Sequence, residues 1–423
     1  MDFSPSNIDA KRNGLQPRRE NSLMRCLGLI RRHLHLNPVN STPQPSVAPA
    51  PAVAPSSAAV RRPNLPALTG LRSLLALTIM FFHYTPPHMQ LLYPVIDSGY
   101  VFVVFFFLLS GYVLAYNYAG RSAPLVKRDF WRARFARVYP VYLLSLAISF
   151  TMLQAEWHAR SHADFFTGLV LTPLLLQGWS PQLATFWNTV AWTLSAEAVL
   201  YATFPWLIRL PWPKSPRRLI ALLVAIWAIG LVPHSLYILL NPDHLAAPVN
   251  RYSSGFWLRA LKYTPMAYAC IFLVGVGLGR LQTVLALTTR QRALLAAASL
   301  IALAAFYARA VSHVPFILMH GGVILPLFAA LIVGLSGPNP IASFFSWRPL
   351  MLLGQASYCL FLLHFNFINM LRLYHIPERL HLAAYDPWIS YAATILLAFA
   401  AYYLVEEPAR KALLRRRAPA RPA

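Results

Sequence analysis

The first long apolar segment of the chain, LTGLRSLLALTIMFFHY, contains both an arginine and a histidine. A guanidinium pairs with anionic groups such as phosphate, and an imidazole can take up or release a proton near neutral pH. His83 follows Arg72 by eleven positions, which on an α-helix places the side chains about 20° apart around the axis and roughly 16 Å apart along it. One face of this helix would therefore carry a cation near one end and a general acid or base near the other.

Glu197 is the acidic residue that we place nearest the centre of an apolar segment, FWNTVAWTLSAEAVLYATF. We assign the other acidic residues to tails, loops or segment ends. Ionisable groups inside a membrane are costly and usually functional, so Glu197 is a candidate catalytic residue. A protonated carboxyl that joins two helices by a hydrogen bond is the structural alternative. His364, in SYCLFLLHFNF, is the second histidine that we place inside an apolar helix.

Other chemical motifs carry little weight. No glycine is followed by lysine, so a Walker phosphate loop is excluded. The segment GVGLGR, with Gly275, Gly277 and Gly279, ends an apolar run and favours close helix packing. The three cysteines show no metal-binding spacing, and we expect no metal.

Composition identifies the environment of these residues. The 423 residues are 57% apolar and only 12% charged, whereas soluble domains have about 25% charged residues. Thirty-seven Lys and Arg against 13 Asp and Glu give a net charge of +24, which alone would be compatible with nucleic-acid binding. Apolar runs of spanning length favour a membrane protein instead, and we expect no nucleic-acid partner.

Ten apolar segments of spanning length follow Leu65, which predicts an all-α polytopic membrane protein with about ten transmembrane helices. A shorter, proline-broken stretch, FFTGLVLTPLLLQGW, is interpreted as re-entrant or interfacial. The ten segments are residues 66–85, 99–118, 137–154, 186–208, 218–239, 264–282, 292–312, 316–336, 348–371 and 387–405.

The basic loops predict the orientation of these helices. Loops 121–137 and 209–218, the stretch 280–292 and the basic tail RKALLRRR fall on one side if there are ten spans. The positive-inside rule makes that side cytoplasmic, together with both termini. We therefore expect a multi-pass protein of the cytoplasmic, or inner, membrane.

The chain divides into three parts by composition. Residues 1–64 are predicted to be a disordered, basic, Pro/Ala-rich cytoplasmic tail, residues 65–408 the membrane domain, and residues 409–423 a short basic tail. Within the first tail, SLMRCLGLIRRHLHL is compatible either with a membrane-surface helix or with simple disorder.

Six motifs, taken in order, resemble those of the acyltransferase-3 family of integral membrane O-acyltransferases. Arg72 and His83 match its R-x10-H helix, and Ser110 and Gly111 its FFxLSG segment. The remaining motifs are the RxxR pair Arg134 and Arg137, AWTLSAE with Trp192, Ser195 and Glu197, LGQASYCLFLLH with Gly354, Ser357, Tyr358 and His364, and YYLVEEPAR with Glu407 and Pro408. Thr69, Ser73 and Val104 depart from the family pattern at positions outside the expected chemistry.

This resemblance implies transfer of an acyl group, typically acetyl from acetyl-CoA, to a hydroxyl of a carbohydrate or glycosylated acceptor. Arg72, Arg134 and Arg137 would hold the CoA phosphates. His83 would act as general base or as an acyl carrier, and Glu197 would orient its imidazole. Ser110, Trp192, Ser195, Ser357, Tyr358 and His364 would line or support the acceptor site.

Two other classes of protein fit the same sequence. A transporter or flippase for a polar lipid or solute would use the in-membrane Glu and His as a proton relay. A non-enzymatic membrane subunit recruited through its basic tail is the third. The sequence leaves open the acceptor, the acyl chain length and the oligomeric state.

Overall fold

The computed structural model describes residues 64–120, 124–246 and 248–415. These residues form helices and connecting loops without a β-strand. The predicted tail 1–64, apart from Asn64, and the end of the chain from residue 416 lie outside the described residues.

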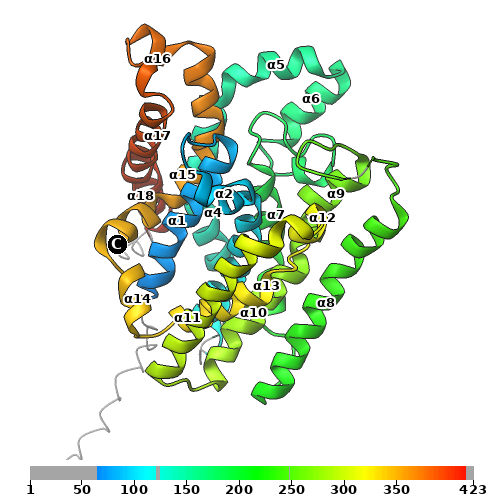
Figure 1. Cartoon of the computed structure of the whole chain (residues 1–423), viewed down its shortest axis with the longest axis vertical. Coiled ribbons are helices and arrows are strands. Elements are labelled where there is room, and N and C mark those ends of the chain that lie inside the picture. Colours follow the sequence, from blue (N-terminus) through cyan, green and yellow to red (C-terminus); the bar gives the residue numbers. More distant parts are fainter. Residues whose placement is uncertain (1–63, 121–123, 247, 416–423) are drawn as a thin grey trace, which may run out of the picture. The chain divides into compact units, whose positions relative to one another are not determined.

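Ten longer helices of the described chain each overlap one of the ten predicted segments, and Figure 1 shows their arrangement. They are α1 (Pro66–His83), α3 (Phe102–Tyr118), α4 (Lys127–Ile148), α7 (Trp192–Leu207), α8 (Pro216–Leu240), α10 (Ala269–Val284), α11 (Thr289–Ala305), α13 (Leu325–Leu335), α15 (Arg348–Leu373) and α17 (Trp388–Ala401). Shorter helices connect them: α2 (Tyr93–Asp97), α5 (Met152–Ala159), α6 (His162–Leu171), α9 (Phe256–Tyr263), α12 (Phe316–His320), α14 (Pro340–Phe345), α16 (Ile376–Arg379) and α18 (Glu407–Leu414).

Nine helical segments of the described chain are long and apolar enough to cross a membrane. The protein is therefore an all-α, multi-pass membrane protein, as predicted. The exception among the ten predicted spans is 186–208, where only the 16 residues of α7 are helical. The chain before α7 has irregular backbone, with a positive φ of 65° at Trp187. This segment is shorter than expected because its first part packs as a loop inside the protein.

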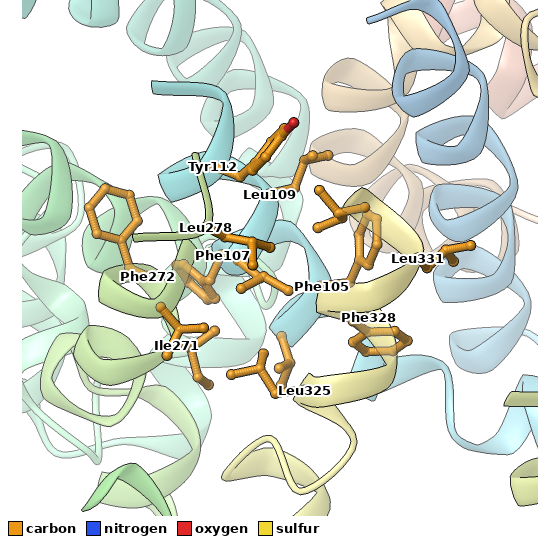
Figure 2. Close-up of a cluster of buried hydrophobic side chains, with 14 of the residues drawn as sticks. Phe105, Phe107, Leu109, Tyr112, Ile271, Phe272, Leu278, Leu325, Phe328 and Leu331 are labelled. Atoms are coloured by element: carbon orange, nitrogen blue, oxygen red, sulfur yellow. The ribbon is translucent and has the colours of Figure 1, made fainter. Parts of the chain in front are cut away.

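Glycines bring α3 and α10 close together at the centre of the bundle. A Cβ on Gly275 would lie 2.2 Å from the Leu108 carbonyl oxygen, and one on Gly111 would lie 2.3 Å from that of Phe272. The predicted packing role of the GVGLGR segment is thus confirmed. Figure 2 shows Phe105 and Phe107 of α3, Phe272 of α10 and Phe328 of α13 in the buried apolar cluster that surrounds this contact.

Helices α1 and α15 pack side by side, again through glycine. A Cβ on Gly354 would lie 2.0 Å from the carbonyl oxygen of Thr69. This close approach sets the N-terminal half of α1 directly against α15, so that motifs almost 300 residues apart lie together. In contrast, α8 lies at the edge of the bundle with most of its side chains exposed (Figure 1).

Two helices differ from the sequence-based expectation in ways that matter for the site. We assigned residues 121–137 to a loop, but α4 begins at Lys127. Arg134 and Arg137 therefore project from a helix, three residues apart and on neighbouring positions of one face.

Near the end of the chain, a π-helical turn over Tyr402–Glu406 interrupts the helix between α17 and α18. Such turns often occur at functional sites.

Candidate active site

A cavity of about 590 Å³ lies between α1, α3, α4, α7 and α15. Arg72, Arg134 and Arg137 all line it, together with Glu197 and Ser110. Residues at both ends of the domain, Asn64 and Arg410, also line it. The start of α1 and the middle of α18 therefore meet at the same cavity.

Four arginines line this cavity, and three of them, Arg72, Arg134 and Arg137, are without a salt bridge in the described part of the chain. Within the described residues, the buried Nε of Arg134 also has no hydrogen-bond partner. Arg72 and Arg137 interact electrostatically with each other, which is unfavourable for two cations. A cavity with this excess of guanidinium groups is suited to an anionic ligand such as a phosphate ester.

Glu197 lies beside these arginines rather than beside His83. Its Oε1 accepts a hydrogen bond from Ser110 Oγ at 2.7 Å and another from the hydroxyl of Tyr201. Within the described residues, Glu197 makes no contact with the imidazole of His83. The expectation that Glu197 orients His83 is therefore corrected. Glu197 instead joins α7 to α3 through Ser110.

Glu406 is a second carboxylate at this cavity, and sequence analysis did not single it out. Its side chain lines the same cavity, is only 3% exposed and accepts a hydrogen bond from Cys359 Sγ at 3.3 Å. Glu406 interacts electrostatically with Arg137 and Arg72. The sequence signal was present: Glu406 is the acid two positions before Pro408 in the E-x-P motif, whereas we had picked Glu407, which pairs with Arg410 and Lys411.

His83 and His364 meet at the opposite end of α1. Their ring centroids are 5.2 Å apart, and His83 also contacts the Phe365 ring edge-on at 4.9 Å. Nδ1 of His364 is 2.7 Å from the carbonyl oxygen of Phe361. Because a carbonyl only accepts hydrogen bonds, His364 Nδ1 carries the proton and Nε2 is left as an acceptor. That buried Nε2 has no partner within the described part of the chain.

One layer of aromatic side chains separates the cavity from this histidine pair. Phe106 and Phe361 both line the cavity, and their ring centroids are 6.3 Å apart. The ring of Phe361 is in turn 6.1 Å from that of His364. His83 and His364 do not line the cavity, and the ring of Phe361 lies between the cavity and His364.

The remaining predicted residues fall into two groups. Ser357 and Tyr358 line the cavity, where Ser357 Oγ donates to the Gly354 carbonyl and the Tyr358 hydroxyl donates to that of Val138 at 2.8 Å. Ser195 and Trp192 do not line it. Ser195 Oγ donates to the Leu175 carbonyl at 2.7 Å and accepts from the Gly178 N–H, so it holds the loop before α7 in place. Trp192 packs against Tyr268.

The fold and the cavity define a class of protein. It is a multi-pass helical membrane protein with a cavity lined by Arg72, Arg134 and Arg137, here called the arginine cavity, close to a histidine pair. A family model described as an acyltransferase domain matches residues 65–407, which is most of the chain. The protein belongs to the acyltransferase-3 family. No solved structure gives a significant match.

Three relatives illustrate the range of the family. Acyltransferase MdmB of Streptomyces mycarofaciens is 34% identical over 169 residues, which are 37% of this chain and 42% of MdmB. O-acetyltransferase OatA of Staphylococcus aureus is 22% identical over 385 residues, covering 82% of this chain and 57% of OatA. Peptidoglycan O-acetyltransferase OatA of Listeria monocytogenes is 22% identical over 385 residues, covering 83% and 56%. The chain spans about half the length of the curated relatives that it matches.

Proposed function

We propose that this protein transfers an acyl group, acetyl in the simplest case, from acyl-CoA on the cytoplasmic side to a hydroxyl of a carbohydrate or glycosylated acceptor. The observation that carries the proposal is the cavity with three arginines that form no ion pair within the described residues. Coenzyme A is an anionic phosphate ester with a thin thioester arm, and the cavity offers guanidinium groups for the phosphates. Membership of the acyltransferase-3 family supports the same chemistry.

The histidine pair supplies the proton transfer in this proposal. His83 removes the proton of the acceptor hydroxyl while the oxygen attacks the thioester carbonyl. A C–O bond forms, the C–S bond breaks, and the proton is returned to the departing thiolate to give CoA thiol. The Nε2 of His364, which has no hydrogen-bond partner among the described residues, would stabilise the imidazolium that forms on His83 beside it.

Glu197 and Glu406 have a supporting role in the arginine cavity. Each carboxylate interacts electrostatically with Arg72, and each is tied to a neighbouring helix by a hydrogen bond from Ser110 or Cys359. Such fixed carboxylates hold guanidinium groups in position before the donor binds. Ser357 and Tyr358 form the wall of the cavity on the side of α15.

The location and the acceptor follow from the same reasoning. The orientation predicted from the basic loops places the arginine cavity on the cytoplasmic side of an inner membrane, where acyl-CoA is made. The name of the Listeria monocytogenes relative indicates peptidoglycan, a glycan, as the acceptor of that protein, and we extend that class of acceptor to this chain.

Mass spectrometry of glycans and glycosylated small molecules from cells with and without this protein tests the proposal. We expect one class of molecule to lose the mass of an acyl group when the protein is absent, and to regain it with the wild-type chain but not with His83→Gln. Identical acylation in the presence and absence of the protein would refute it.

A further inference from the structure

A second cavity, of about 440 Å³, runs along the outer surface between α4 and α7. Its lining is almost entirely apolar. On one wall, Trp131, Phe135, Val138 and Tyr139 form a single stripe of α4, and on the other wall Leu194, Ala198, Tyr201 and Ala202 form a matching stripe of α7. In both stripes the residues are spaced i, i+4, i+7 and i+8, which is one face of an α-helix. We call this feature the α4–α7 groove.

The α4–α7 groove opens toward the side of the bundle that faces hydrocarbon. Trp131, Phe135 and Trp206 are each between 38% and 51% exposed. Trp131 and Trp206 pack together at the cytoplasmic end, with ring centroids 5.8 Å apart, and Lys127 lies 4.2 Å above the Trp206 ring. Tryptophan and lysine at one level are typical of the membrane interface. The groove therefore extends from that interface toward the centre of the bilayer.

The inner end of the α4–α7 groove joins the arginine cavity. Five residues line both: Arg134, Val138, Leu194, Glu197 and Tyr201. A ligand whose charged part occupies the arginine cavity thus has an apolar outlet beside Glu197. At this outlet, small side chains of α7, Ala198 and Ala202, leave the space between the aromatic residues open.

We propose that the α4–α7 groove holds the hydrocarbon chain of the acyl donor, so that the enzyme takes acyl-CoA with chains longer than acetyl. This inference rests on the proposed function, because it assumes that the CoA part binds at Arg72, Arg134 and Arg137. The connection between the polar and apolar cavities matches a molecule that is anionic at one end and apolar at the other. The reaction is the same acyl transfer: the thioester C–S bond breaks, an ester C–O bond forms, and the hydroxyl proton ends on the CoA thiol.

Binding of CoA, acetyl-CoA, hexanoyl-CoA and octanoyl-CoA to the purified protein in lipid nanodiscs tests the inference, with empty nanodiscs as the blank. Each methylene that enters an apolar groove adds up to about fourfold in affinity. We therefore expect octanoyl-CoA to bind at least tenfold more tightly than acetyl-CoA. Ala202→Leu and Ala198→Leu fill the groove and should lower this ratio at least tenfold. Ala225→Leu, on the exposed face of α8, is the matched control and should leave the ratio unchanged.

The possible results separate the two proposals. If no CoA compound binds, the proposed function fails. If acetyl-CoA and octanoyl-CoA bind equally, the function stands and the chain-binding groove is refuted. If affinity rises with chain length to the same degree in the Ala198 and Ala202 variants, the chain dissolves in the bilayer and the groove is again refuted.

Discussion

The ring centroids of His83 on α1 and His364 on α15 lie 5.2 Å apart, although 280 residues lie between the two histidines in the sequence. The glycine contact between these two helices brings the rings together. The hydrogen bond of His364 to the Phe361 carbonyl then leaves its basic nitrogen free for the region around His83. The proposed general base, His83, thus lies next to a second imidazole, and Phe361 separates His364 from the arginine cavity.

Replacing either histidine by glutamine should reduce acyl transfer by different amounts. We expect His83→Gln to lower kcat at least about a hundredfold, the lower range for loss of a general base, because glutamine cannot accept the hydroxyl proton. His364→Gln should have a smaller effect, since it removes only the neighbour of the base. Initial rates of CoA thiol release measure both. His381→Gln, in an exposed loop, is the control, and equal rates for His83→Gln and His381→Gln would contradict the assignment.

Removing one arginine of the cavity should weaken donor binding specifically. Each hydrogen bond between charged partners contributes about 1.5–3 kcal/mol, so Arg72→Gln or Arg137→Gln should raise the KM for acetyl-CoA roughly tenfold or more. Acetyl-N-acetylcysteamine has the same thioester but no phosphates, and its KM should not change. Arg128→Gln, at an exposed position of α4, is the matched variant. A parallel rise for both donors would argue against phosphate binding.

Replacing Glu406 and Glu407 separately by glutamine distinguishes the carboxylate that lines the cavity from its neighbour in the sequence. Glu406→Gln removes a negative charge beside Arg137 and Arg72, which leaves the guanidinium groups less compensated. The ligand-free protein should therefore unfold at a lower temperature, and CoA should bind more tightly. Glu407→Gln removes salt bridges to Arg410 and Lys411 but no charge beside Arg72 and Arg137, and it should change both quantities less. Thermal unfolding with and without CoA provides the test, and equal behaviour of both variants would show that Glu406 does not act on the arginines.

Lys262 gives the stability of the protein a distinct dependence on pH. It lies in α9, outside the spanning segments, and burial lowers its pKa from 10.5 to about 8, with a smaller contribution from Arg259. Between these values the unfolded chain binds more protons than the folded one, so stability rises with pH. Lys262→Met should be more stable than wild type at pH 7, and the difference should shrink as the pH passes 8 toward 10.5. Unfolding temperatures across this range measure it, and a constant difference would contradict the prediction.

The α3–α10 contact should tolerate no additional methyl group. A Cβ at Gly275 would lie 2.2 Å from a backbone oxygen that cannot rotate away. Gly275→Ala should therefore destabilise the protein by about 1–3 kcal/mol, the usual range for overpacking. Ala225→Ser, on the exposed face of α8, controls for a small change in a membrane helix. An unfolding temperature equal to that of the control would show that the helices separate without cost.

Much of this architecture could be predicted from the sequence, because the hydrocarbon core of a bilayer requires long apolar helices. Nine of the ten predicted segments correspond to helices of the described chain that are long and apolar enough to span a membrane, and the packing of GVGLGR also followed from the sequence. The start of α4 could not be predicted in this way. Hydropathy ends a span where charges begin, whereas Arg134 and Arg137 face a polar cavity inside the bundle.

Glu197 and Glu406 show that the contacts of the site, like the start of α4, could not be predicted from the sequence. Glu197 was found by its depth in an apolar segment, but its partners Ser110 and Tyr201 depend on tertiary packing. Glu406 was missed because it occurs beside Glu407 at the end of a span. In the structure Glu406 ends the π-helical turn Tyr402–Glu406 and lines the cavity, whereas Glu407 does not line it.

The most direct test of the account uses purified protein in lipid nanodiscs with radiolabelled acetyl-CoA and a glycan fraction from the producing cells. We predict that CoA thiol and acetylated glycan appear in equal amounts, that both require the glycan, and that both are lost in His83→Gln. CoA release without acetylated glycan, or full acetylation by His83→Gln, would contradict it.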